Sequence, residues 1–338
     1  SNTTNFTYLG IVFNSSGSWT PNTIHRNRAF SREMLAISIF NAKLGSRSIK
    51  HLLKVYKARC VTTATYGAGL WGGTRNKTLE RTENTFLRKI LSVPPGTSSQ
   101  ICFQELGLDP LGELIQMAPA LLWFKVWTKE EAVLNRDILA DCLSLDHVCK
   151  IPWIAKTKKN FKDLGREDLF LSPESLLDLG KRDIKAWSLD HIRLVNSRAF
   201  EGLHSYQYYT RIHTQHGLQP YLSFIESPYQ RFVLTRFRLG IIYRLLTTPI
   251  INDWSKTLPP CCCDDTSQQG MIHFLFFCGF YSKIRSQYLK PLLRELNIGS
   301  CTRTLLHLQQ LNTALECFTL YTFIAKALRT RKSLEGSF

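Results

Sequence analysis

The spacing of hydrophobic positions changes near the N-terminus. In residues 5–13 (NFTYLGIVF), aromatic and aliphatic residues alternate with small ones, which predicts a β-strand. The next stretch, NSSGSWTPN, is rich in turn-forming residues and predicts a loop. After it, apolar residues recur at three- and four-residue spacing in three successive stretches. This spacing places them on one side of a helix, so it predicts three helices with one buried face each.

The three predicted helices have distinct boundaries and buried positions. The first ends at Gly45, a residue type that often follows a helix, and its expected buried positions are Phe30, Met34, Ile37, Phe40 and Leu44. The second spans residues 48–71 with Ser48 as N-cap, and its expected buried positions are Leu52, Leu53, Tyr56, Cys60 and Ala64. The third spans residues 76–91, and its expected buried positions are Leu79, Phe86, Leu87 and Ile90.

The rest of the chain is also mainly helical in its pattern. Pro94-Pro95-Gly96 closes the first block, and helical patterns rich in Leu and Trp follow over residues 98–148. The polar, Lys-rich segment 156–168 predicts a linker or an exposed arm. Further helical patterns occupy residues 172–256 and the C-terminal region after the cysteine cluster. The sequence therefore predicts a mainly α protein with a short β segment at its N-terminus.

Positive charge is concentrated in the first 91 residues. The whole chain has 43 Lys and Arg against 26 Asp and Glu, a formal net charge of +17. Residues 1–91 hold 14 of those cations but only three of the acids. Such an excess favours a polyanionic partner, either nucleic acid or an acidic membrane face. A membrane-spanning segment is not predicted, because no apolar run approaches the roughly 18 residues that a span needs.

Several cations of this region fall on shared helix faces. Lys50, Lys54 and Lys57 are four and three residues apart and stand in one row, while Lys77, Arg81 and Arg88 share a face of the next helix. The alternative is that each row is only a solvated helix face. Uncompensated self-repulsion lowers stability, so the excess of cations favours contact with nucleic acid. The candidate binding residues are Arg28, Arg32, Arg47, Lys50, Lys54, Lys57, Arg81 and Arg88.

A cluster of cysteines near residue 261 carries the other candidate chemistry. Cys261, Cys263, His273 and Cys278 have the spacing C-x-C-x9-H-x4-C. Three thiolates and one imidazole form a closed tetrahedral set of the kind that binds structural Zn²⁺. Cys262 can replace either neighbouring cysteine by spacing alone, and the alternative to a metal site is a group of reduced thiols beside a core histidine.

A catalytic carboxylate pair at Asp264 and Asp265 is not favoured. Adjacent residues of a strand point to opposite faces, and no third carboxylate lies at useful spacing. Six further cysteines are scattered through apolar or helical contexts, which is typical of buried free thiols. A reducing compartment, nuclear or cytoplasmic, fits this pattern.

Short motifs along the chain occur in the order found in one protein family. They are Tyr8-Leu9-Gly10, Val55-Tyr56-Lys57-Ala58, Thr65-Tyr66-Gly67, Trp71-Gly72, Phe86-Leu87-Arg88 and Glu105-Leu106-Gly107, followed by Cys261, Cys263, His273, Cys278, Tyr281 and Arg285. Their order and spacing resemble the C-terminal part of a LINE-type (non-LTR) retrotransposon reverse transcriptase polyprotein. The resemblance covers almost the whole chain. Gly279 departs from it, since the family usually has Pro after the last cysteine.

The resemblance implies a domain organisation. Residues 1–14 correspond to the end of the reverse transcriptase palm, where Tyr8, Leu9 and Gly10 are primer-grip-like, and residues 15–95 to a helical thumb that tracks a template–primer duplex. Residues 96–255 correspond to a helical connector, and residues 256–338 to a C-terminal zinc-knuckle domain. The usual spacing of the family selects Cys261 and Cys263 over Cys262 as ligands.

The resemblance also implies a function without catalysis. The polymerase chemistry of the family uses aspartates on the palm that hold two metal ions, and neither those aspartates with their Mg²⁺ nor the family's endonuclease is encoded here. We therefore expect a fragment with no catalytic residues that is inactive alone. Its expected partners are RNA and DNA, as template–primer or target duplex, and the rest of the parent polyprotein, with no membrane. The alternatives are a domesticated stand-alone nucleic-acid-binding protein and a non-functional retroelement relic.

Overall fold

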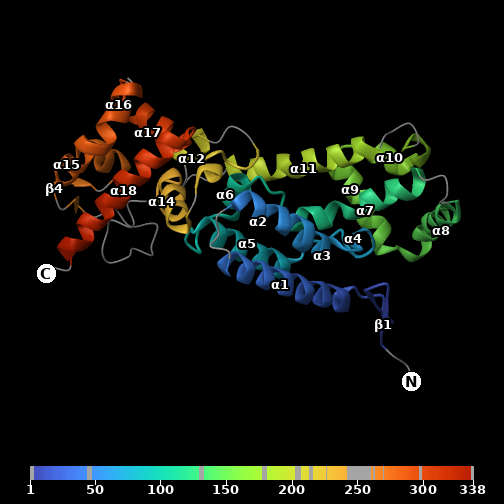
Figure 1. Cartoon of the computed structure of the whole chain (residues 1–338). Coiled ribbons are helices and arrows are strands. Elements are labelled where there is room, and N and C mark those ends of the chain that lie inside the picture. The colour runs from blue at the N-terminus through green and yellow to red at the C-terminus, as the bar shows by residue number, and fades with distance from the viewer. Residues whose placement is uncertain are drawn as a thin grey trace. The chain divides into compact units, whose positions relative to one another are not determined.

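The computed structural model describes residues 4–43, 48–128, 133–176, 181–201, 207–212, 216–225, 227–241, 260–261, 263–268, 270–296 and 299–335. These residues are mainly helical, as predicted (Figure 1). They form two compact units. The first comprises residues 1–41, 51–86 and 108–199, and the second residues 42–50, 87–107 and 200–338. The unit boundaries fall inside four helices and do not coincide with the predicted boundaries after residues 14, 95 and 255.

The first unit contains a β-hairpin and most of the long helices. Its elements are β1 (Asn5–Tyr8), β2 (Ile11–Asn14), α1 (Thr20–Lys43), α2 (Ile49–Val55), the π-helix η1 (Tyr56–Val61), α3 (Thr62–Thr65), α4 (Ala68–Trp71), α5 (Lys77–Leu91), α7 (Leu111–Thr128), α8 (Val133–Cys149), α9 (Pro152–Asp163), α10 (Glu167–Leu171), the 3-10 turn η3 (Pro173–Leu176) and α11 (Lys181–Glu201). The first residues of α2 and the last turn of α5 belong to the second unit.

The second unit is built from shorter helices and a small hairpin. Its elements are α6 (Ser99–Leu106), α12 (Gln207–Ile212), α13 (Tyr221–Phe224), α14 (Pro228–Arg238), β3 (Pro260–Cys261), β4 (Asp264–Gln268), the π-helix η6 (His273–Phe277), the 3-10 turn η7 (Gly279–Tyr281), α15 (Ser282–Ile284), the π-helix η8 (Arg285–Leu289), α16 (Lys290–Leu296), α17 (Cys301–Gln310) and α18 (Ala314–Glu335).

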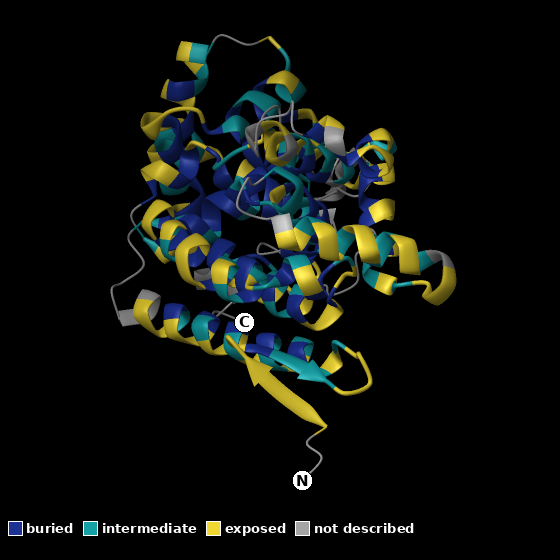
Figure 2. Ribbon diagram, turned by 90° about the vertical axis from the view of Figure 1, so that its right-hand side faces the viewer, coloured by how far each residue is buried: buried dark blue, intermediate teal, exposed yellow. Residues whose placement is uncertain are grey.

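The predicted strand at residues 5–13 is instead a tight hairpin. β1 and β2 pair antiparallel with Tyr8 opposite Ile11. The two connecting residues have positive φ, 45° at Leu9 and 75° at Gly10, as the primed turns of two-residue hairpin loops require. Figure 2 shows β1 exposed along its whole length, whereas Ile11 of β2 is buried. The single-strand prediction was wrong because alternation continues across a two-residue turn without a break.

Helix α1 holds this hairpin through polar side chains. Asn22 accepts a hydrogen bond from the Val12 amide at 3.1 Å, and Arg26 donates to the Gly10 carbonyl. The Arg26 guanidinium also lies over the Tyr66 ring, 5.2 Å from its centroid, and the Tyr66 hydroxyl donates to the Leu9 carbonyl at 2.8 Å. Arg26 is therefore buried in a structural role.

The predicted helix faces are mostly confirmed. Every expected buried residue of the second and third helices is buried, as are Phe30, Met34 and Ile37 of the first. Phe40 was predicted wrongly, since it is 52% exposed near the end of α1. Leu44, Gly45 and Cys262 lie outside the described residues. The burial of Cys60, Cys102 and Cys317 raises the pKa of each thiol to about 12, whereas Cys149 is exposed.

The second predicted helix is broken twice. Its centre is a π-helical turn, η1, and it stops at Tyr66 because Gly67 adopts a left-handed conformation with φ 67°. The next helix, α4, packs against α7. Gly72 permits this approach, because a Cβ there would collide with the carbonyl oxygens of Ala68 and Ile115. Apolar periodicity continued through the break because both halves bury the same side.

The predicted linker at residues 156–168 was also wrong. Most of it is helix α9, which packs against α7 through Ile154 and Phe161. Asn160 of α9 donates to the Gln116 carbonyl at 2.7 Å. The core here centres on Trp123, whose ring stacks on that of Phe170 with centroids 4.8 Å apart. The lysines of α9 mask this buried face in the sequence because they fill the solvent-facing positions between the apolar ones.

A buried ion pair organises the second unit. Arg238 of α14 donates to the Glu105 carboxylate of α6 at 2.8 Å, with both side chains almost completely buried. Burial alone would lower the pKa of Arg238, but Glu105 holds that pKa above its usual range. The other polar partners of the pair are the Tyr209 hydroxyl, the Gln219 amide oxygen and the carbonyls of Gln309 and Gln310.

A buried carboxyl group lies in the core of the first unit. Glu83 of α5 accepts hydrogen bonds from the Tyr56 hydroxyl at 2.5 Å and the Leu111 amide at 3.2 Å. Burial raises the pKa of Glu83 to about 8 against an ordinary value of 4.5. At neutral pH the folded state therefore retains a proton that the unfolded chain has released.

This retained proton predicts a pH-dependent stability. Between about pH 4.5 and pH 8 the folded state binds more protons than the unfolded state, so the free energy of unfolding should fall as pH rises. The fall is at most about 1.4 kcal/mol per pH unit for one proton. The Glu83→Gln variant should flatten this slope in urea unfolding at a series of pH values. Glu167→Gln, at a half-exposed position, should keep it; equal slopes in the Glu83→Gln variant and the unsubstituted chain would contradict the assignment.

Candidate functional site

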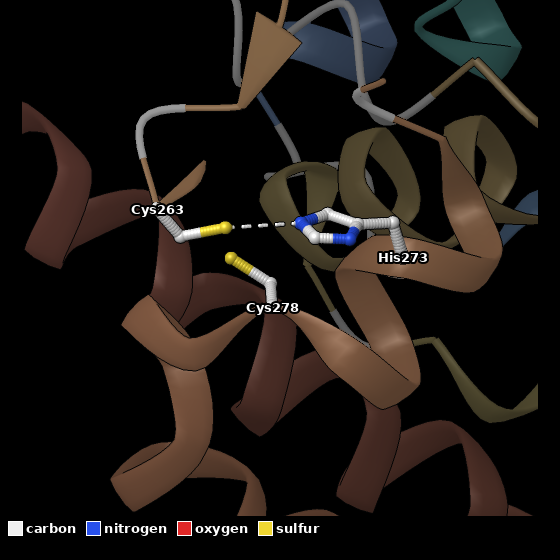
Figure 3. A group of neighbouring side chains, drawn as sticks. All are labelled: Cys263, His273 and Cys278. Carbon is white, nitrogen blue, oxygen red and sulfur yellow. Dashed lines mark hydrogen bonds between the residues drawn. The ribbon is translucent and has the colours of Figure 1, made fainter. Parts of the chain in front are cut away.

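Three potential metal ligands converge in the second unit. The ligand atoms of Cys263, His273 and Cys278 all lie within 4.8 Å of one another, and the two cysteine sulfurs face the same edge of the imidazole (Figure 3). Cys263 Sγ is 3.2 Å from His273 Nε2. Cys278 is buried, and the other two are half-buried. No other group of three potential metal ligands is found in the part of the chain that the structure describes.

Local backbone structure places each of these side chains. Cys263 lies in the connection of the β3–β4 hairpin, in which Cys261 is paired with Asp264. His273 begins the π-helix η6, and Cys278 follows its last residue. The Cys278 amide donates to the His273 carbonyl at 2.7 Å. This wide five-residue turn brings the x4 spacing of histidine and cysteine to one side.

Arg285 stabilises the same turn through hydrogen bonds to its backbone carbonyls. Its guanidinium donates to three carbonyls of the turn, with distances of 2.6 Å to Leu275, 2.8 Å to Cys278 and 3.3 Å to Phe274. Burial lowers the pKa of Arg285, and the neighbouring Cys278 opposes that shift. Arg285 thus positions the Cys278 backbone and brings positive charge close to its thiol.

An aromatic contact anchors the turn to the longest helix of the unit. Phe274, directly after His273, meets Tyr281 edge-on with centroids 5.2 Å apart and Phe323 of α18 at 5.4 Å. Phe274 and Phe323 are both buried. The histidine ligand is therefore supported by packed core rather than by a free loop.

The donor set fits a tetrahedral metal ion. With Zn–S near 2.3 Å and Zn–N near 2.0 Å, tetrahedral geometry places two ligand atoms roughly 3.5–3.8 Å apart. The 3.2 Å between Cys263 Sγ and His273 Nε2 is slightly shorter, and all three ligand atoms lie within 4.8 Å of one another. Three of the four predicted ligands thus come together. The side chain of Cys261 lies outside the described residues, as do those of Asp264 and Asp265.

The basic candidate residues divide into two kinds. Arg28 and Arg32 of α1, Lys54 of α2, Lys57 of η1 and Arg81 of α5 are exposed in the first unit. Within the described residues none of the five has an ion-pair partner. Lys50 is exposed as well, on the first turn of α2. These side chains are available to an external anion.

Two other predicted cations differ from this group. Arg88 is half-buried, and its Nε donates to the Thr97 carbonyl at 2.7 Å in the second unit. Arg47 lies outside the described residues. Arg88 closes the turn after α5, so its part in binding an external anion stays a prediction that the geometry does not favour.

Most carboxylates among the cations already have partners. Glu33 pairs with Arg59 at 2.9 Å, and Glu80 pairs with Arg75 at 2.8 Å. The pKa of His25 on α1 is lowered by burial and further by the charges of Arg26, Arg32 and Arg28. Arg28 and Arg32 of α1 have no carboxylate partner within the part of the chain that the structure describes.

The hairpin presents aromatic side chains that the sequence did not single out. Phe6 and Tyr8 of β1 stack with centroids 6.4 Å apart and an interplanar angle of 14°. They are 60% and 58% exposed, and Leu9 beside them is 71% exposed. Phe6 was missed, although its i, i+2 relation to Tyr8 predicts that the two share one face. Of the three residues predicted to be primer-grip-like, Leu9 and Gly10 form the turn, and the side chains of Tyr8 and Leu9 are exposed.

Comparisons of the chain with protein-family models, curated proteins and solved structures found no match. Among the described residues, every helix is too short or too polar to cross a lipid bilayer. The proposed function therefore rests on the cations of residues 1–91 and on the geometry of Cys263, His273 and Cys278.

The carbonyl contacts of Arg285 predict a local stability effect. Arg285→Ala removes charge-assisted hydrogen bonds worth about 1.5–3 kcal/mol each, so amides of residues 271–281 should exchange hydrogen at least tenfold faster. Arg285→Lys should restore little, because an ammonium cannot reproduce the planar fork. Arg294→Ala, which removes an exposed arginine of α16, is the control and should leave exchange unchanged. Unchanged exchange in Arg285→Ala would show that the contacts are dispensable.

Proposed function

We propose that the chain binds nucleic acid through the exposed cations of its first unit. The main support is the exposure of five cations that have no ion-pair partners among the described residues: Arg28, Arg32, Lys54, Lys57 and Arg81. They lie within residues 1–91, which hold 14 cations and three acids. Phosphate groups neutralise such a surface, and their counterions are released on binding. A polyanion therefore relieves the self-repulsion among the cations of residues 1–91.

We further propose that the chain is the C-terminal part of a LINE-type reverse transcriptase. This proposal rests on the ordered motifs from Tyr8 to Arg285. In it, the cationic helices act as a thumb that holds a template–primer or target duplex, and Tyr8, Leu9 and Gly10 form a primer-grip-like hairpin. Catalysis belongs to a palm domain with its Mg²⁺ ions elsewhere in the parent polyprotein.

Zn²⁺ is the metal that we propose for the converging ligands. Cys263, His273 and Cys278 supply two sulfurs and one nitrogen, and the resemblance to the family implies Cys261 as the fourth ligand. Sulfur-rich tetrahedral sets without an open position hold zinc in a structural role. The metal would join the β3–β4 hairpin to η6, so this segment acts as a small zinc-knuckle domain.

The salt dependence of binding tests the nucleic-acid proposal. For about five phosphate contacts on B-DNA, log K should fall with log salt at a slope near −4.5, from roughly −0.9 per contact. The triple variant Lys50→Ala, Lys54→Ala, Lys57→Ala should bind a duplex or RNA–DNA hybrid at least tenfold more weakly and lower the slope magnitude by about 2–3, with unchanged circular dichroism.

A matched variant controls for net charge. Lys158→Ala, Lys159→Ala, Lys162→Ala removes the same charge from exposed positions of α9, and its slope should change by less than half as much. If both triple variants weaken binding equally, the attraction depends on net charge alone. The row of Lys50, Lys54 and Lys57 is then not a binding face.

Metal content tests the zinc proposal. Native mass spectrometry of the chain should show one Zn²⁺, and Cys263→Ser or His273→Ala should reduce it toward zero because losing one ligand opens the tetrahedron. Structural zinc in finger peptides supplies on the order of 10–16 kcal/mol at neutral pH. Chelation should therefore unfold residues 260–281 while leaving the helices of the first unit intact.

Three cysteine variants define the ligand set. Cys262→Ser should retain the zinc, and Cys301→Ser, which alters a half-buried thiol on α17, is the control for thiol loss. Zinc that survives Cys261→Ser but not Cys262→Ser would reassign the fourth ligand. A metal-free wild-type chain would leave reduced thiols beside a histidine.

The parent transcript separates the three origins of such a chain. A palm and an endonuclease in the same upstream reading frame support a polyprotein fragment. A start codon close to Ser1 without a palm supports a domesticated nucleic-acid-binding protein. A frame interrupted by stop codons supports a relic.

A further inference from the structure

Helix α8 of the first unit has two apolar faces. Leu139, Cys142 and Leu143 pack against the core cluster that contains Trp123. A second face of the helix carries Leu134, Ile138, Leu145 and Val148, which are 72%, 50%, 52% and 81% exposed. Soluble proteins rarely leave several large apolar side chains contiguous on one surface without a binding role.

The exposed face has the spacing of a helix–helix seam. Leu134, Ile138, Asp141, Leu145 and Val148 follow one another at intervals of four, three, four and three residues. This is the alternation of the two seam positions in a coiled coil, which faces a partner helix continuously. The seam covers the whole length of α8, so it can receive about four helical turns of a partner.

Acidic side chains distinguish this seam from a purely apolar one. Asp141 occupies its central position, and Asp137 flanks it one turn earlier. Both are exposed and lack ion-pair partners among the described residues. A buried carboxylate in a helix interface must meet a cation or a hydrogen-bond donor, since an unpaired buried charge is strongly unfavourable.

The position of these acids argues against other occupants. An anionic lipid surface binds helices with cationic flanks, and nucleic acid would be repelled by Asp137 and Asp141. In a symmetric pair of α8 helices from two copies, maximal overlap of the seam places Asp141 directly opposite its own copy. Like charges in such a contact disfavour the dimer.

We propose that this face of α8 binds an amphipathic helix of another polypeptide that carries a cation opposite Asp141. Leu134, Ile138, Leu145 and Val148 pack against the apolar seam of that helix. Asp141 pairs with its central Lys or Arg, which sets the register, and Asp137 pairs with a cation on its flank. This surface is independent of the proposed nucleic-acid and zinc sites.

A pair of designed peptides tests the proposal on the full chain. The probe is a fluorescent three-heptad helix with Leu at the seam positions, one central seam Lys and Lys flanks. The comparison peptide has Glu in place of each Lys. Fluorescence anisotropy should show at least tenfold tighter binding of the Lys peptide. Asp141→Lys should reverse the preference, which a merely sticky apolar patch would not do.

Neutral variants remove the apolar contacts without adding charge. Ile138→Ser with Leu145→Ser should weaken binding of the Lys peptide at least tenfold, at unchanged melting temperature. The control is Leu171→Ser, which alters a side chain 65% exposed on α10 and should change nothing. Equal binding of both peptides would overturn the proposal. So would vesicle binding or self-association of the unsubstituted chain that the double variant abolishes, since either assigns the face to another occupant.

Discussion

The buried pair of Arg238 and Glu105 is the interaction on which the second unit depends. Its two charges are removed from water, and removing either partner would leave an uncompensated charge at a cost of about 3–5 kcal/mol. The same guanidinium binds the last carbonyls of α17, and α14 packs against α18, whose Phe323 contacts Phe274 beside the histidine ligand. The turn that carries His273 and Cys278 is therefore linked to this ion pair through the packing of α14 and α18.

The buried acid of the first unit is stabilised differently from Glu105. This buried carboxyl, Glu83, has no cationic partner among the residues that the structure describes and stays protonated near neutrality, held by hydrogen bonds from Tyr56 and the Leu111 amide. The cations Arg28, Arg32, Lys54, Lys57 and Arg81 are instead exposed, without ion-pair partners among the described residues. Exposed cations that take no part in the core are well suited to bind a polyanion, because binding does not disturb the interactions that maintain the fold.

The sequence predicted faces more reliably than boundaries. Leu52, Tyr56 and Ala64 were expected to be buried and are, yet the helix that contains them is interrupted at Gly67. Helix α9 was missed in the sequence because lysines fill its solvent-facing positions, whereas the buried positions of a helix need to recur only every three or four residues. The hairpin turn at Leu9 was hidden because alternation of side chains is the same in one strand as in two.

What the sequence determined by itself was the helical class, the concentration of charge and the spacing of Cys263, His273 and Cys278, since these follow from local periodicity and residue chemistry. Only the tertiary structure decided which cations are available to an external anion. Arg88, for example, is half-buried because its side chain donates a hydrogen bond to the Thr97 carbonyl. The tertiary structure also decided that one apolar face of α8 is packed and the other is open. A periodic pattern specifies that a helix has an apolar face, but burial depends on whether another element lies opposite it.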